Sequence, residues 1–229
     1  MVMKCSIKKI PLLSYFLFLL LFALSFSSCT KKKNHIKPQQ ALQRLMKGNQ
    51  RYVNNKSEHP NRSEERRKEL TSKQTPYAVI VGCSDSRVAP EIIFDEGLGD
   101  LFVIRVAGNV IGPIELESIK YAAFQLNSPI ILVLGHENCG AVQAVVQDKT
   151  TDIQAISELI EPAVIEAQEA TTKNKKQPLL EQAIKNNALN MQKLLKHSPN
   201  IEQLIQKNKI QVHAAYYNLK TGLVELLQE

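Results

Sequence analysis

Three mainly apolar runs constrain the fold of this chain of 229 residues more than any other feature. They span residues 77–82, 101–106 and 129–134, and helical patterns lie between them. An apolar run without alternation is typical of a strand that is buried on both faces, and strands that alternate with helices form a parallel sheet. The sequence therefore predicts an α/β domain with a central, mostly parallel β-sheet flanked by helices.

Helical patterns account for most of the remaining chain. Apolar residues recur near helical spacing over residues 38–53, which predicts an N-terminal helical arm ahead of the first strand. Further helices are expected over residues 63–72, 90–94, 113–126, 139–147, 153–170, 179–195 and 201–208. Residues 211–218 and 222–227 are expected to form a last pair of strands at the sheet edge, but the pattern does not identify the strand that they join.

The first 28 residues have the pattern of a secretory signal. Three lysines precede eighteen uncharged residues, 11–28, which are rich in Leu and Phe. Small residues then end in Cys29, as in a lipoprotein signal, where the cysteine is lipidated and becomes the new N-terminus, although Phe26 stands where Leu is usual. A simple cleaved signal and an uncleaved membrane anchor remain open, because eighteen apolar residues can span a bilayer. All three readings place the domain in the periplasm or cell envelope.

Residues 29–37 follow as a basic, polar tether that would hold the domain away from a lipid surface. Loss of residues 1–28 removes three lysines and no acids, so the net charge falls from +7 to +4. No basic stripe with interleaved aromatic residues is present, and nucleic acid is therefore not expected as a partner. Residues 38–229 are long enough to form one domain with a substantial core.

The use of cysteine separates the export signal from the folded domain. Cys5 leaves with the signal and Cys29 is assigned to the lipid, so the domain retains only Cys83 and Cys139. Two cysteines in an exported protein could form one disulfide. That alternative does not account for the polar residues that accompany both cysteines.

Two cysteine-centred motifs follow directly after predicted strands. Cys83 and Asp85 are two residues apart, a spacing that places both on one side of an extended chain. His136 and Cys139 are three residues apart, which places both on one face of a tight turn or helix start. Ligands of open α/β sheets bind at the carboxyl ends of the strands, and thiolate, imidazole and carboxylate are the ligands that zinc accepts. The sequence therefore predicts a zinc site at this edge of the sheet.

These motifs resemble the two signatures of the β-class carbonic anhydrases. Residues 82–88 (GCSDSRV) with 90–91 are similar to the first signature, and residues 135–142 (GHENCGAV) are similar to the second. The segment at 105–109 (RVAGN) resembles the one that links them. The resemblance is close over residues 40–147 and looser beyond. It implies the α/β fold of that family, one Zn²⁺ per subunit and a homo-oligomer, either a dimer or a tetramer.

The resemblance also implies a role for each polar residue. Zinc would be held by Cys83, His136 and Cys139, with Asp85 and Arg87 as a catalytic pair. Asp85 on the metal would close the site, whereas Asp85 turned toward Arg87 would leave the fourth position to water, whose pKa zinc lowers to about 7. The zinc-bound hydroxide would hydrate CO₂ reversibly to bicarbonate and a proton. The expected activity is that of a carbonic anhydrase.

Four further residues are assigned by the resemblance to the substrate pocket: Gln74, Phe102, Tyr121 and Gly140. Gln74 lies where related proteins have a glutamine that can hydrogen-bond substrate. Phe102 and Tyr121 would form apolar walls, and plain core packing is the alternative for both. The pocket of the family lies between subunits, so some of these residues would serve a neighbouring site. Gly140, like Gly108, is expected to permit a close approach of the backbone.

Three other functions remain open at this point. Related proteins hydrolyse CS₂ or COS with closely similar motifs. A non-catalytic zinc protein would keep its site closed by Asp85, and Arg87 argues against this function, since a permanently closed site needs no such partner. A thiol redox protein would instead join Cys83 and Cys139 in a disulfide and bind no metal.

Overall fold

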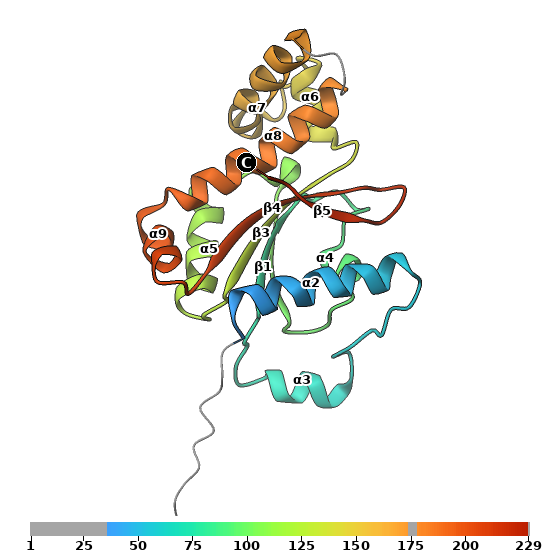
Figure 1. Cartoon of the computed structure of the whole chain (residues 1–229), viewed down its shortest axis with the longest axis vertical. Coiled ribbons are helices and arrows are strands. Elements are labelled where there is room, and N and C mark those ends of the chain that lie inside the picture. The colour runs from blue at the N-terminus through green and yellow to red at the C-terminus, as the bar shows by residue number, and fades with distance from the viewer. Residues whose placement is uncertain (1–35, 174–177, 229) are drawn as a thin grey trace, which may run out of the picture. The chain divides into compact units, whose positions relative to one another are not determined.

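A five-stranded β-sheet forms the centre of the computed structural model, which describes residues 36–173 and 178–228 (Figure 1). The strand order is β2-β1-β3-β4-β5, and the strands are Ala78–Gly82 (β1), Leu101–Arg105 (β2), Ile130–His136 (β3), Gln211–Tyr217 (β4) and Val224–Leu226 (β5). The first four run parallel and β5 is antiparallel to β4. The predicted α/β class with a mostly parallel sheet is confirmed. The predicted signal peptide, Cys29 and the tether up to residue 35 lie outside the described residues.

Helices cover both faces of this sheet (Figure 1). The N-terminal arm, α2 (Pro38–Val53), and the short α4 (Pro90–Ile93) pack on one face. The other face is covered by α5 (Pro113–Phe124), α6 (Gly140–Val146), α7 (Gln154–Lys173), α8 (Leu179–Lys196) and α9 (Pro199–Gln206). The remaining elements are α3 (Glu64–Leu70) and the 3₁₀ turn η1 (Ala107–Asn109). Within residues 36–173 and 178–228, no helix has both the length and the apolar composition of a membrane-spanning segment.

Burial on both faces explains the apolar composition of β1 and β3. Val79 and Val81 of β1 belong to the core beneath α5–α8, while Ala78 and Ile80 belong to the core beneath α2. The prediction of a fully buried strand is wrong for β2, whose side chains are only half-buried or exposed. The reason is that β2 lies at the edge of the sheet, where one side has no neighbouring strand.

The order of the strands creates a switch point between β1 and β3. The chain passes from β1 to β2 on one side and then returns to place β3 on the other side of β1. Connections from β1 and β3 therefore leave in opposite directions, which opens a crevice at their carboxyl ends. The last pair of strands, whose partner the sequence does not identify, joins this sheet through the parallel pairing of β4 with β3.

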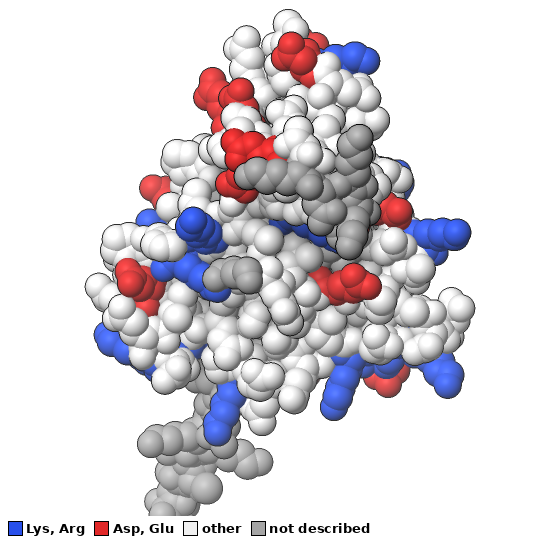
Figure 2. Space-filling view, turned by 45° about the horizontal axis from the view of Figure 1, so that its top comes forward, with Lys and Arg blue, Asp and Glu red and all other residues white. Residues whose placement is uncertain are grey.

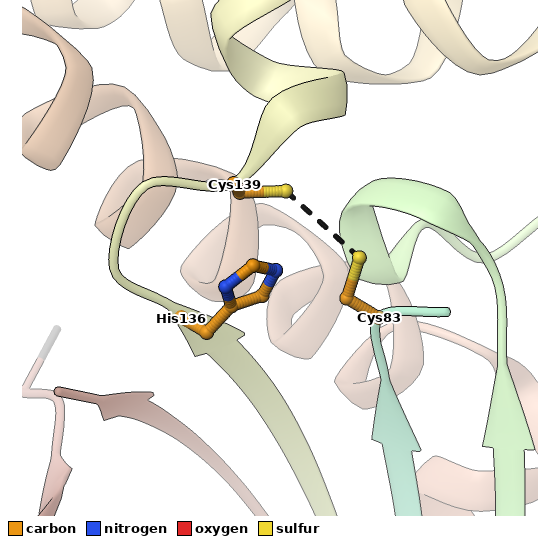
Figure 3. A group of neighbouring side chains, drawn as sticks. All are labelled: Cys83, His136 and Cys139. Atoms are coloured by element: carbon orange, nitrogen blue, oxygen red, sulfur yellow. Dashed lines mark hydrogen bonds between the residues drawn. The ribbon is translucent and has the colours of Figure 1, made fainter. Parts of the chain in front are cut away.

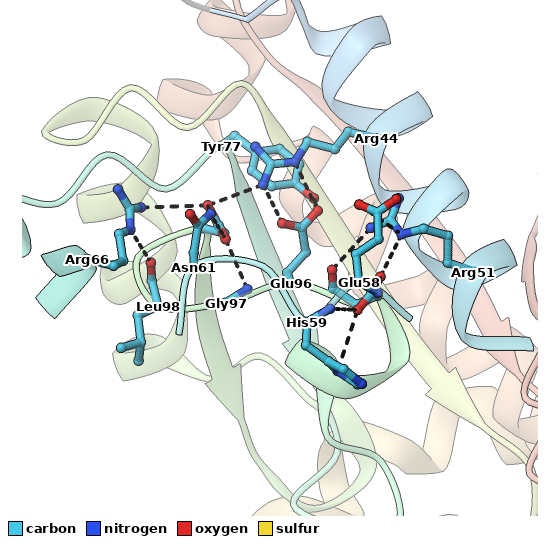
Figure 4. Close-up of polar contacts among 12 residues, drawn as sticks. Arg44, Arg51, Glu58, His59, Asn61, Arg66, Tyr77, Glu96, Gly97 and Leu98 are labelled. Carbon is cyan, nitrogen blue, oxygen red and sulfur yellow. Dashed lines mark hydrogen bonds and ion pairs between the residues drawn. The ribbon is translucent and has the colours of Figure 1, made fainter. Parts of the chain in front are cut away.

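Buried carboxylates hold the N-terminal arm against the sheet (Figure 4). Glu96 accepts hydrogen bonds from Arg44 Nε at 3.0 Å and from the Tyr77 hydroxyl at 2.6 Å. Asp95 accepts a hydrogen bond from Arg51 Nε at 2.6 Å and from two backbone amides of the loop after α2. Each buried charge is thus paired, which is the condition for placing a carboxylate inside a protein.

Charges of both signs occur on the surface but are unevenly spread. Figure 2, in which the α7 end comes forward, shows Asp and Glu gathered over that end, with Lys and Arg scattered around the rest of the face. The exposed glutamates of α7 are Glu158, Glu161, Glu166 and Glu169. The positive net charge of the sequence is therefore not shared by this end of the described structure.

Candidate metal centre

Three potential metal ligands meet at the switch point (Figure 3). Cys83 is the first residue after β1, His136 is the last residue of β3, and Cys139 precedes the first residue of α6. Their ligand atoms lie within 4.8 Å of one another, and all three side chains are buried. The structure therefore brings together the three residues to which zinc is assigned.

A tight turn brings the second and third ligands together. Asn138, between them, has a φ of 53°, a left-handed conformation that asparagine tolerates better than most residues. The chain reverses at this point, and Cys139 can face back toward His136 before α6 begins. The spacing of three residues is thus realised by a turn after a strand.

The orientation of His136 fits a metal ion. Its Nδ1 lies 2.9 Å from the backbone oxygen of Glu137, and a carbonyl oxygen can only accept, so Nδ1 carries the proton. The lone pair is then on Nε2, which is buried and has no hydrogen-bond partner among the described residues. A buried polar atom without a partner is rare and costly, and a metal ion would satisfy it. Two sulfurs and one imidazole nitrogen form a donor set typical of zinc.

The two cysteines are free thiols. Their sulfurs are 4.0 Å apart, about twice the length of a disulfide bond. The pKa of Cys83 is lowered, chiefly because the Cys139 thiol hydrogen-bonds to it, and the same bond raises the pKa of Cys139. The arrangement thus favours a thiolate at Cys83 even before a metal binds.

Asp85 is turned toward Arg87. Arg87 donates from its backbone nitrogen and Nε to Asp85 Oδ1, both at 2.9 Å, and from Nη2 to Oδ2 at 2.6 Å. This guanidinium lowers the pKa of Asp85 well below its usual range, so the carboxyl is charged at neutral pH. Oδ2 lies 3.9 Å from His136 Nε2. The carboxylate therefore stands beside the three ligands, and its hydrogen bonds are directed to the arginine.

Arg105 supports this loop from β2. Its Nε donates to the carbonyl oxygen of Cys83 at 2.9 Å, and its Nη2 donates to that of Asp85 at 2.6 Å. The sequence shows Arg105 only as part of a signature segment, without a role. Its contacts depend on the pairing of β2 with β1, which residue spacing does not reveal.

Three of the predicted pocket residues lie away from this centre in the same chain. Gln74 precedes β1, whereas Cys83 follows it. Phe102 pairs with the second residue of β1, and its ring centroid is 6.2 Å from that of Tyr121. Gln74 and Tyr121 both line an open hollow of about 570 Å³. These residues therefore lie toward the amino end of β1, opposite to the end that carries the ligands.

The two glycines assigned to close backbone approach differ. A Cβ at Gly140 would meet no atom within 4 Å, so the expected close approach is wrong for this residue within the chain. Gly108 has a φ of 72°, and a Cβ there would lie 2.7 Å from Ile160 Cδ1. The expectation therefore holds for Gly108 alone, since it is packed beneath α7.

Comparison with known proteins agrees with this geometry. The family model described as "Carbonic anhydrase" matches residues 78–224, well over half of the chain. Carbonic anhydrase 2 from Mycobacterium tuberculosis is 54% identical over 107 residues, which cover 47% of this chain and 52% of that protein. The chain thus spans about half the length of this curated relative.

Solved structures show the same fold. The β-carbonic anhydrase CcaA matches with a TM-score of 0.64 and 26% identity, covering 82% of this chain and 95% of that one. A β-carbonic anhydrase from Sordaria macrospora, described as tetrameric, matches with a TM-score of 0.64 and 22% identity, covering 82% and 97% of the two chains. The matched residues include both ligand motifs and the sheet that positions them. This chain belongs to the β-class carbonic anhydrase family.

Proposed function

We propose that this protein catalyses the reversible hydration of CO₂ to bicarbonate and a proton at a zinc ion held by Cys83, His136 and Cys139. One observation carries the proposal: a buried imidazole nitrogen, with no hydrogen-bond partner in the part of the chain that the structure describes, lies with two thiols and beside the Asp85–Arg87 pair. A purely structural zinc site needs four protein ligands, and here the fourth candidate is bound to an arginine instead. An open position is the mark of a catalytic site.

Zinc, when bound, would lower the pKa of a water to about 7 and supply a nucleophile at neutral pH. The residues of the chain supply its orientation. Asp85 is charged and would accept a hydrogen bond from the nucleophile, which would direct a lone pair of the nucleophile toward the carbon of CO₂. Arg87 keeps the carboxylate in this position through charge-assisted hydrogen bonds to both oxygens.

Stopped-flow measurement of CO₂ hydration by the zinc-loaded protein tests this function. We expect kcat/KM to rise with pH through one ionisation near about 7, because the nucleophile forms over that range. The metal-free protein is the control and should show only the background rate. Zinc-loaded protein that leaves CO₂ at the background rate, or that turns over CS₂ or COS alone, would contradict the proposal.

The homo-oligomer, a dimer or tetramer, is part of the proposal. Ile114, Tyr121 and Phe124 of α5 have exposed fractions of 76%, 50% and 40%, and β2 beside them is only half-buried. An exposed apolar face of this kind indicates a protein contact. A partner on this face would bring its own metal site toward Gln74 and Tyr121, which have no site of their own at that end of the sheet.

Export and lipid anchoring are proposed from the N-terminal sequence. The basic start, the apolar stretch over residues 11–28 and the small residues before Cys29 support cleavage at this cysteine and its lipidation. Residues 29–37 would then tether the enzyme to a membrane of the cell envelope, where CO₂ and bicarbonate would be interconverted. The membrane contact would thus be made through the lipid.

Native mass spectrometry of the protein purified from its membrane fraction tests both proposals. We expect a mature chain that begins at an acylated Cys29 and that assembles into two or four subunits. Matched protein in which Cys29 is replaced by alanine should carry no acyl group and assemble equally well. An unmodified Cys29 would exclude the lipid anchor, and a monomer at micromolar concentration would exclude the oligomer.

A further inference from the structure

Asn187 is a polar residue in the apolar face of α8. Its neighbours on this face, Ile184, Ala188 and Met191, belong to the hydrophobic core, and Asn187 itself is fully buried. Burial of an amide is unfavourable unless it is hydrogen-bonded. The position therefore calls for a specific contact.

That contact is made with the segment after β2. Asn187 Nδ2 donates to the carbonyl oxygen of Gly108 at 2.7 Å. A carbonyl oxygen only accepts, so the atom that faces it is the amide nitrogen and the orientation of the side chain is determined. Asn187 Oδ1 has no hydrogen-bond partner within residues 36–173 and 178–228. The buried amide group thus makes one hydrogen bond, and an apolar side chain would suit the packing at this position better.

Gly108 connects Asn187 to the metal centre through its own backbone. Its own N–H lies 3.3 Å from Cys83 Sγ and donates to it. The φ and ψ of Gly108 are 72° and 12°, and Ile160 of α7 closes the space where a Cβ would stand. Because these angles are fixed, the direction of the carbonyl determines the direction of the N–H. A donor on the carbonyl oxygen therefore aims the N–H at the sulfur.

We propose that Asn187 is a positioning residue of the metal centre, which holds Gly108 so that its N–H donates to the Cys83 sulfur. A hydrogen bond to a ligating thiolate withdraws electron density from the sulfur and fixes its direction, so it adjusts both the retention of the metal and its strength as a Lewis acid. This inference rests on the proposed zinc function. It assigns a part in that function to α8, which supplies none of the ligands.

Replacement of Asn187 by leucine tests the proposal, with Asn190→Leu as the matched control. Leucine has nearly the same size but cannot donate. Asn190 lies one turn further along α8, is outside the core, and contacts Glu166. Competition with a chelator should show a zinc affinity about 10- to 100-fold lower for N187L and unchanged for N190L. In the Co²⁺-substituted protein, the sulfur-to-cobalt charge-transfer band of N187L alone should move to longer wavelength.

The unfolding of the metal-free variants is measured in parallel, because a merely structural asparagine would alter stability but not the cobalt spectrum. Zinc affinity and cobalt spectrum of N187L equal to those of N190L would overturn the proposal, whatever the stability. Wild-type protein that binds no zinc would instead refute the proposed function.

A second measurement needs no variant and covers the case in which N187L does not fold. In ¹⁵N-labelled wild-type protein loaded with ¹¹³Cd²⁺, a hydrogen bond from Gly108 to the ligating sulfur should couple the amide proton to the metal nucleus. Splitting of the Gly108 resonance is the expected result. Its absence in a cadmium-loaded, folded protein would overturn the inference.

Discussion

Cys83→Ser is expected to abolish zinc binding and CO₂ hydration together. The hydroxyl of serine does not ionise at neutral pH, so the site would lose one of its two anionic ligands. The N–H of Gly108 and the guanidinium of Arg105, which now support the Cys83 sulfur and carbonyl, cannot replace the lost charge. The fall in zinc affinity should exceed the 10- to 100-fold, roughly, that the loss of an outer-shell partner costs.

Metal analysis after dialysis provides the measurement, with stopped-flow rates on the same samples. Ser84→Ala is the matched control, since Ser84 is adjacent in sequence but exposed, and it should retain about one zinc per chain. A Cys83→Ser protein that keeps its zinc would show that the three-ligand assignment is wrong. Wild-type protein that carries a Cys83–Cys139 disulfide in place of metal would point to thiol redox chemistry.

Asp85→Ala and Arg87→Ala are expected to lose activity while retaining zinc. Neither residue belongs to the three-ligand cluster, so metal content should remain near one per chain. Loss of the hydrogen-bond acceptor that orients the nucleophile should lower kcat by about 100-fold or more, comparable to the usual contribution of a positioned acid or base. Arg87→Ala leaves the carboxylate and the backbone hydrogen bond to it in place, but removes the two hydrogen bonds from the guanidinium that direct it.

The pH dependence of Arg87→Ala distinguishes orientation from charge. Arg87 lowers the pKa of Asp85 in the wild type, so its removal lets that pKa rise toward the ordinary value of about 4. Asp85 would still be ionised at pH 7 to 9, and a rate that stays low at high pH therefore reflects lost orientation. Arg67→Ala, on the exposed surface of α3, is the control. Unchanged rates in both dyad variants would exclude the proposed role.

The local patterns of the sequence predict the central part of the fold and the three residues that meet at its switch point. The runs at 77–82 and 129–134 correspond to β1 and β3. They can be recognised because a strand that is buried on both faces consists almost entirely of apolar residues. Spacing also identifies Cys83, His136 and Cys139, since each motif lies within four residues of the chain. The position of β2 at the sheet edge and the partner of β4 are settled by pairing between distant segments, which local patterns do not record.

The same limit applies to the surroundings of the site. Arg105 of β2 contacts the Cys83 carbonyl from 22 residues further along the chain. Asn187 of α8 contacts Gly108, whose N–H in turn donates to the Cys83 sulfur. A buried asparagine among apolar residues at helical spacing is a signal that could have singled out Asn187. Gln74 and Tyr121 lie at the far end of β1, away from the ligands of the same chain, and spacing along the sequence does not reveal this separation.

One side chain joins the two motifs that the sequence presents separately. Arg87, in the first motif, donates from Nη2 to the carbonyl oxygen of Asn138 at 3.2 Å, in the middle of the second. The same nitrogen donates to Asp85 Oδ2, so one guanidinium contacts both the turn before Cys139 and the carboxylate beside the three ligand residues. Each motif therefore contains part of the scaffold of the other. The turn between His136 and Cys139 therefore has two requirements: it places two ligand residues together, and it presents a carbonyl oxygen to an arginine some fifty residues earlier. Neither motif could be moved into another protein alone with its chemistry intact.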